Sequence, residues 1–168
     1  MNMRKCIQVG CALLSSVLAA SAWAAPALTV GTASGQAGTT VNLPISFDPG
    51  AASVLSMQFN LTLPPSLSTG TITPGAILAA AGKGVSANRR GRNWTFIVFG
   101  LNQNAIGAGP LLTVQMRIAP GAAAGTLNVP VSSVVYADLN GVAINPGALK
   151  GGAVTVLAAS PSASPPRH

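Results

Sequence analysis

Side chains that could carry out catalysis are very few in this chain. Of its 168 residues only two are acidic, Asp48 and Asp138, and its one histidine, His168, is the last residue. Glycoside hydrolysis usually requires two carboxyl groups that flank the scissile bond. Here Asp48 lies in an Asp-Pro-Gly segment and Asp138 lies in an Asp-Leu-Asn-Gly segment, and both segments are typical of turns. A catalytic triad also needs a histidine beside its nucleophile. The sequence therefore predicts a protein that is not an enzyme.

Metal and cofactor ligands are equally scarce. Both cysteines, Cys6 and Cys11, lie in an N-terminal segment that we interpret as a signal peptide, so no thiol is expected in the mature protein. Zinc then lacks a ligand set, and no phosphate-binding P-loop motif is present. Asp138 and Asn140 could supply a weak calcium site with backbone carbonyls, but a plain hairpin turn is the simpler interpretation. We expect no metal and no cofactor.

Three arginines, Arg89, Arg90 and Arg92, form the main basic cluster of a chain that has nine basic residues against two acidic ones. Such a cluster could attract an acidic partner, an anionic surface polymer or a nucleic acid. A solvated hairpin turn over residues 88–93 is the simpler interpretation, because no nucleic-acid-binding motif or interleaved aromatic residue accompanies the arginines. We expect no nucleic-acid partner.

The segment that follows, residues 93–99, is apolar on both sides of a predicted strand. One side must enter the core, and the other is either covered by a loop or exposed as a contact patch. We favour the covered arrangement; if the side is exposed, its aromatic residues and the nearby arginines would suit a protein interface. One side of the strand carries Trp94, Phe96 and Val98, and the other side carries Ile97 and Phe99.

Residues 1–25 have the layout of a secretory signal peptide. Positive charge near the start is followed by an apolar run over residues 7–20 and then by small residues, with cleavage expected after Ala24 or Ala25. The apolar run is shorter than the ~20 residues of a membrane span. We therefore expect a secreted protein, extracellular or at the cell surface, without stable membrane insertion.

The elements that follow are predicted to be short strands. Hydrophobic residues make up 49% and charged residues 7% of the chain, and residues 55–63 alternate strictly between apolar and polar, as a half-buried strand does. About nine such runs, separated by Gly, Pro and Asn turns, indicate an all-β sandwich or barrel over residues 26–158. The Pro/Ser-rich residues 159–168 are predicted to be a disordered tail.

In order and spacing, these elements resemble a cohesin domain, the module that holds dockerin-bearing enzymes in cellulosomes. Four stretches carry the resemblance. They are the opening strands from Val30-Gly31-Thr32 to Ile45, the third strand and turn from Met57 to Leu67, the run Gly109–Met116, and the closing elements from Tyr136 to Val156. Where the family turn usually reads Tyr-Asp-Pro, this chain has Leu63-Pro64-Pro65.

The resemblance implies a nine-stranded jelly-roll sandwich and a partner-binding face built from the third, fifth, sixth and eighth strands. The matching outward positions of the third strand are Ser56, Gln58 and Asn60, all of them neutral. With the arginine segment, these give the predicted partner-binding residues Ser56, Gln58, Asn60, Arg90, Arg92 and Trp94.

Three functions follow from these observations. The first is a secreted, non-catalytic module for protein attachment of the dockerin type, linked to extracellular polysaccharide degradation. The alternatives are a carbohydrate-binding module of the same fold and a structural or adhesive surface protein, since a fold does not fix a function. A polysaccharide ligand is weakly supported, because the chain has few aromatic residues for a sugar-stacking platform.

Overall fold

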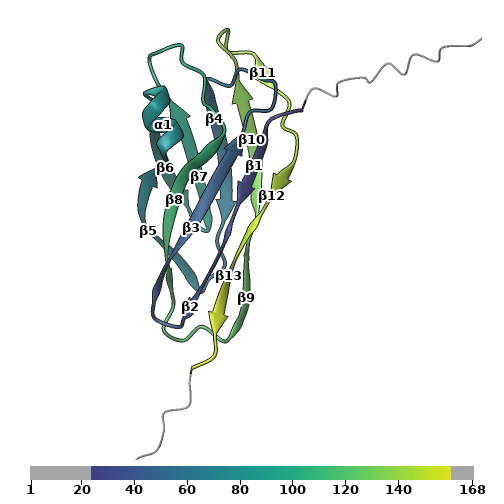
Figure 1. The fold of residues 1–168 in the computed structure, drawn as a ribbon. Coiled ribbons are helices and arrows are strands. Elements are labelled where there is room, and N and C mark those ends of the chain that lie inside the picture. Colours follow the sequence, from purple (N-terminus) through teal and green to yellow (C-terminus); the bar gives the residue numbers. More distant parts are fainter. Residues whose placement is uncertain (1–23, 160–168) are drawn as a thin grey trace, which may run out of the picture.

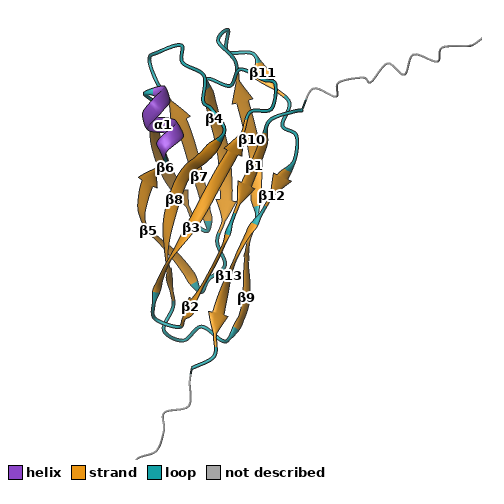
Figure 2. Cartoon of the chain, in the orientation of Figure 1, coloured by secondary structure: helices purple, strands orange, loops and turns teal. Residues whose placement is uncertain are grey.

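A computed structural model describes residues 24–159 of the protein. The predicted all-β sandwich is confirmed: two layers of strands face each other, and the only helix of the described residues is short (Figures 1 and 2). Residues 1–23 and 160–168, which hold most of the predicted signal peptide and of the predicted tail, lie outside the described residues.

Thirteen strands form three hydrogen-bonded sheets. Their orders are β12-β1-β3-β8-β5, β11-β10-β4-β7-β6 and β2-β13-β9. The strands are β1 (Ala27–Val30), β2 (Thr32–Gln36), β3 (Thr40–Asp48), β4 (Ser56–Thr62), β5 (Leu67–Pro74), β6 (Gly84–Arg90), β7 (Asn93–Phe99), β8 (Gly109–Ile118), β9 (Gly125–Val129), β10 (Val131–Ala137), β11 (Ala143–Ile144), β12 (Leu149–Lys150) and β13 (Gly152–Leu157).

Three pairs of consecutive strands are each separated by a single residue, at which the chain passes from one sheet to another. The divisions fall at Gly31 between β1 and β2, at Pro130 between β9 and β10, and at Gly151 between β12 and β13. Gly31 donates its N–H to Pro44 O over 2.8 Å and accepts from Ala153 N over 3.3 Å. A Cβ atom on Gly31 would lie 2.8 Å from Cγ of Pro44, so the chain can make this close approach only at a residue without a side chain. The short strands beside these crossings, such as β2 and β12, are part of the reason why the structure has thirteen strands where about nine were predicted.

Alternation along β3 and β4 builds the core between the sheets. Val41, Leu43, Ile45 and Phe47 are buried on β3, whereas the residues between them are exposed. Two aromatic pairs fill the interior: Phe59 stacks on Phe96 with ring centroids 5.1 Å apart, and Phe47 packs against Tyr136 at 5.4 Å. Such pairs add roughly 0.5–1.5 kcal/mol beyond the burial of their area.

The sequence reading missed one element, the helix α1 (Ala76–Ala81). Only strands and turns were expected in this part of the chain, but β5 ends at Pro74 and a helix follows Gly75. The segment Ala-Ile-Leu-Ala-Ala-Ala has high helix propensity, and Gly82 ends it in the left-handed conformation (φ 63°). Within residues 24–159, no helix has the length and apolar character needed to cross a membrane.

Both acidic side chains serve the backbone of turns. Asp48 Oδ1 accepts a hydrogen bond from Gly50 N over 2.9 Å. Asp138 Oδ1 accepts two, from Asn140 N and Val142 N, each over 2.8 Å. The hairpin turn expected at Asn140-Gly141 is therefore present, with Gly141 at φ 74°.

Candidate functional site

The outward face of the sheet β11-β10-β4-β7-β6 is a regular grid of side chains, which we call the front face. Its rows follow from the strand register. In one row Gln58 on β4 lies between Val135 on β10 and Ile97 on β7, and Ile97 lies opposite Ser86 on β6. In the next row towards the end that carries the β10–β11 turn, Ser56 lies opposite Ala137 and Phe99 lies opposite Gly84.

These two rows enclose an apolar hollow of about 330 Å³. Ile97, Phe99 and Val135 line it and expose 41%, 51% and 47% of their surface. The covered arrangement that the sequence favoured for this side of β7 is therefore wrong. Phe96 and Val98 enter the core, and the opposite side of the strand is left open because no loop of the described residues crosses it.

A small residue keeps the hollow open beside Phe99. Its strand partner is Gly84, and a Cβ atom on Gly84 would lie 3.8 Å from Cζ of the Phe99 ring. The Phe99 ring thus lies next to the backbone of Gly84, which has no side chain. The loops that follow β7 and β10 at this end add further exposed apolar side chains, Leu101, Leu139 and Val142.

Polar side chains take over in the next two rows of the front face. Asn60 on β4 lies between Ser132 on β10 and Thr95 on β7. The Oδ1 atom of Asn60 is buried and has no hydrogen-bond partner among the described residues. A buried acceptor without a donor costs roughly 1–3 kcal/mol. In the last row Thr62 Oγ1 donates to Asn93 Oδ1 over 2.8 Å.

The structure brings four of the six predicted partner-binding residues to the front face and separates the other two from it. Ser56, Gln58 and Asn60 follow one another on β4, and Arg90 lies opposite Asn93 at the edge. Trp94 instead belongs to the inward side of β7, where it is half-buried against the core. Arg92 lies in the turn after Gly91, beside Trp94 in a different hollow.

The arginine turn is also tighter than the predicted segment 88–93. β6 continues to Arg90 and β7 begins at Asn93, so that only Gly91 and Arg92 form the loop. Gly91 has φ 61°, as the tight two-residue turns of hairpins require. Arg89 and Arg90 are therefore strand residues on opposite sides of β6.

Val135 was missed as a site residue. Between Ser132 and Val135 the register of β10 against β4 shifts by one residue, and Ser133 adopts φ 51°. This β-bulge places Val135 beside Gln58. The Val-Ser-Ser-Val-Val-Tyr sequence of the strand, apolar on both sides in its second half, was the available signal.

The other large sheet presents a different outward face, which we call the back face. A hollow of about 410 Å³ there is lined by five polar residues of β3, β5 and β8, namely Asn42, Thr71, Thr73, Thr113 and Gln115. Of these two faces, only the front face exposes a group of apolar side chains.

Comparisons with known proteins agree with this arrangement. The family model described as "Cohesin domain" matches residues 26–156. A type I cohesin–dockerin complex from Clostridium thermocellum contains a chain of TM-score 0.70 and 17% identity, covering 80% of this chain and 100% of that one. A non-cellulosomal cohesin from the archaeon Archaeoglobus fulgidus gives TM-score 0.69 and 17% identity over 80% and 93%.

A third similar structure is the seventh ScaB type I cohesin from Pseudobacteroides cellulosolvens. Its TM-score is 0.70 at 18% identity, with 86% of this chain and 99% of that chain covered. No curated protein matches the chain in sequence. At these identities the solved structures establish a shared fold.

Proposed function

Because the chain belongs to the cohesin domain family, we propose that it is a non-catalytic attachment module whose front face binds a dockerin-type protein. Cohesin domains are binding modules, and solved relatives of the same fold are seen in complexes with dockerins. The fold alone does not say which surface binds. That choice rests on the side chains of this chain.

The apolar hollow of the front face is the observation that carries the proposal. Ile97, Phe99 and Val135 lie near the centre of the sheet, and each exposes two-fifths or more of its surface. Contact of this apolar surface with water is unfavourable. Exposed apolar patches rimmed by polar residues mark interaction sites, and aromatic anchors at the centre of an interface contribute most of its binding energy.

The polar rows beside the hollow would supply specificity. Gln58 stands between Val135 and Ile97, and Asn60 offers a buried acceptor that nothing in the described residues satisfies. The side-chain amides of Gln58 and Asn60 carry both donors and acceptors for a partner on this face. Ser56, Gln58 and Asn60 are thus proposed to orient the partner, while the apolar residues hold it.

Titration calorimetry with purified dockerin modules from the same organism tests this function. We expect one dockerin to bind with 1:1 stoichiometry, and Ile97→Asp to weaken it by at least ~100-fold, because a charge would be buried without a partner. Thr113→Asp, the same change in kind on the back face, should leave binding unchanged. Binding that survives Ile97→Asp, or no binding by any dockerin of that organism, would overturn the proposal.

We also propose that the module acts outside the cytoplasmic membrane. The support is the charged start, apolar run and small residues of positions 1–25. Mass spectrometry of the protein recovered from the culture medium should show an N-terminus at Ala25 or Pro26. An intact Met1 on a protein found only in the cytoplasm would contradict it.

A further inference from the structure

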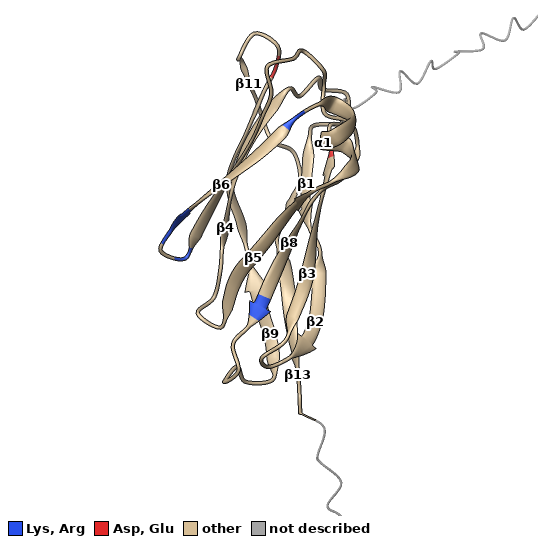
Figure 3. Cartoon of the chain, turned by 90° about the vertical axis from the view of Figure 1, so that its left-hand side faces the viewer, with Lys and Arg blue, Asp and Glu red and all other residues tan. Residues whose placement is uncertain are grey.

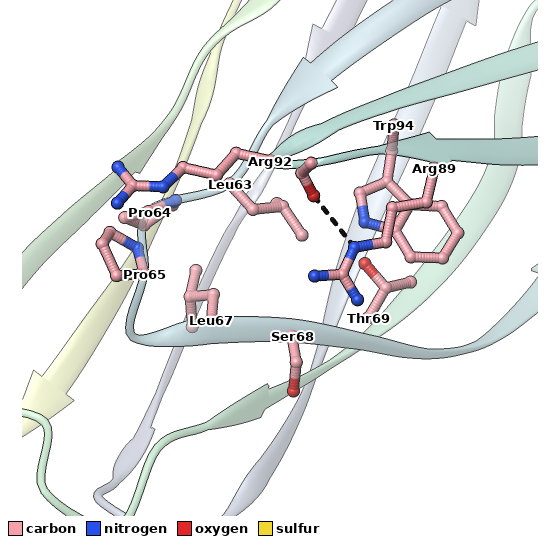
Figure 4. Close-up of a pocket in the computed structure, with 10 residues that line it drawn as sticks. Leu63, Pro64, Pro65, Leu67, Ser68, Thr69, Arg89, Arg92 and Trp94 are labelled. Carbon is pink, nitrogen blue, oxygen red and sulfur yellow. Dashed lines mark hydrogen bonds between the residues drawn. The ribbon is translucent and has the colours of Figure 1, made fainter.

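A second hollow, which we call the arginine pocket, opens at the other end of the sandwich between β5 and the β6–β7 hairpin (Figure 4). Its volume is about 170 Å³. Leu63 and Leu67 form the apolar part of its wall, Pro64 and Pro65 its rim, and Arg89, Arg92 and Trp94 its hairpin side. Thr69 of β5 adds a hydroxyl group on the facing side, whereas the side chain of Ser68 points away from the pocket.

Arg89 is held in place for binding. Its Nε donates to Gly91 O over 2.9 Å, the one side-chain hydrogen bond that it makes within residues 24–159. This bond fixes the plane of the guanidinium while both terminal amino groups keep their protons free. Figure 4 shows those amino groups directed to the space beside Thr69, with the Trp94 indole next to the guanidinium. A planar fork of donors of this kind matches a carboxylate.

No internal carboxylate competes for these donors. The two acidic residues of the chain, Asp48 and Asp138, are engaged in turns far from the hairpin (Figure 3). Ala137 lies opposite Ser56 at one end of β4 and Asn93 lies opposite Thr62 at the other. Six residues of strand at ~3.3 Å each separate the two ends, or about 20 Å. The arginine pocket is therefore an uncompensated cationic site.

We propose that the arginine pocket binds a carboxylate-bearing sugar, a uronate unit of an acidic polysaccharide. Arg89 would hold the carboxylate, the Trp94 indole would lie against the sugar ring, and Thr69 would meet one of its hydroxyl groups. The Trp94 indole beside the guanidinium favours a sugar over an acidic peptide side chain, because its flat face can pack against a sugar ring while the Arg89 fork holds the carboxylate. The pocket, at about 170 Å³, is smaller than the ~300 Å³ of pockets for drug-sized ligands, so a single ring is the natural occupant.

This site is independent of the proposed docking function. It lies at the opposite end of β4 from the apolar hollow and shares none of its lining residues. A module that held a protein on its front face and an acidic glycan in its arginine pocket would connect the two.

Tryptophan fluorescence gives a direct readout. The chain has two tryptophans, so Trp23→Phe in the full chain leaves Trp94 as the sole reporter. We expect trigalacturonate to change its emission with saturation, and the neutral trisaccharide of galactose to bind at least tenfold more weakly. Sodium acetate and triglutamate serve as the bare carboxylate and the acidic peptide. An equal response to triglutamate would assign the pocket to a peptide and overturn the proposal.

Matched variants locate the effect. Arg89→Gln and Arg90→Gln remove the same charge from neighbouring positions on opposite sides of β6. Arg89→Gln should weaken trigalacturonate at least tenfold, Arg89→Lys should recover only part of the loss because it lacks the fork, and Arg90→Gln should have less than a twofold effect. Equal losses for the two glutamine variants, or no response of Trp94 to trigalacturonate, would show that no such site exists.

Discussion

The front and back faces of this sandwich have the same kind of backbone but differ in the side chains that they expose. Both are outward faces of five-stranded sheets, and both are hollowed. The back face fills its hollow with Thr, Asn and Gln, whereas the front face exposes Ile97, Phe99 and Val135. In a chain with only 7% charged residues, charge cannot distinguish a binding surface from a solvated one. Exposed apolar area does so instead.

The difference also separates residues of one strand. β7 sends Phe96 into the core and Phe99 to the front face, so the two rings have different tasks although they are three residues apart. Phe96→Ala should cost ~3–5 kcal/mol of stability, because it empties a fully buried stacked pair. Phe99→Ala should cost less than about 1 kcal/mol. Urea unfolding of both variants measures this, and similar losses would mean that the front face is part of the core.

Beneath the front face, β10 carries a buried polar group, and its effect on stability should depend on pH. Tyr136 is fully buried, its hydroxyl has no partner among the described residues, and burial raises its pKa to about 12. Since the unfolded tyrosine ionises near pH 10, stability should be intact below pH 10 and fall by up to ~2.5 kcal/mol as the pH rises to 12.

Tyr136→Phe is the matched variant for this effect. It should flatten the alkaline decline and leave stability at pH 7 unchanged or higher, because it removes an unpaired polar group. Urea midpoints measured from pH 8 to pH 11.5 in both proteins provide the comparison. An equally steep decline in the phenylalanine variant would place the responsible group elsewhere.

Binding should separate the two faces a second time. Phe99→Ala should weaken the dockerin complex about tenfold, or ~1.4 kcal/mol, as truncation of an interface anchor does. Thr73→Ala on the back face should have no measurable effect on the same titration. If the back-face variant weakens binding more than Phe99→Ala does, the assignment of the faces is reversed.

We expect the smallest effect when salt is varied. Salt should change dockerin binding at the front face far less than ligand binding in the arginine pocket. The centre of the front face is neutral, so raising NaCl from about 50 to 500 mM should change dockerin affinity less than about twofold. Trigalacturonate binding at Arg89 should weaken over the same range. A steep salt dependence of the dockerin complex would point to Arg90 and the edge of the face instead of its centre.

The sequence was sufficient for the fold class and for the β4 part of the face. Alternation over residues 55–63 predicted which side of β4 is buried, and the structure agrees. The exposure of Ile97 and Phe99 could not be settled, because a strand that is apolar on both sides is compatible with a covering loop. Val135 depended on a bulge at Ser133. Trp94 lies off the front face because it shares the inward side of β7 with Phe96 and Val98.

The places where strands change sheet were equally hidden from periodicity. Gly31, Pro130 and Gly151 interrupt runs that alternate on both sides of the break. Which sheet each half joins depends on contacts with strands elsewhere in the chain, such as the contact of Gly31 with Ala153. Local pattern carries no information about such pairings.

The pairing of the terminal strands has a mechanical consequence. β2 and β13 run parallel over five residue pairs, and β1 runs parallel to β12. The described chain therefore enters at one end of the sandwich and leaves at the other (Figure 1). Tension applied through residues 24 and 159 would pull these strands along their length in opposite directions. The hydrogen bonds between these strands lie perpendicular to the pulling direction. They would bear the force together and break together, not one after another.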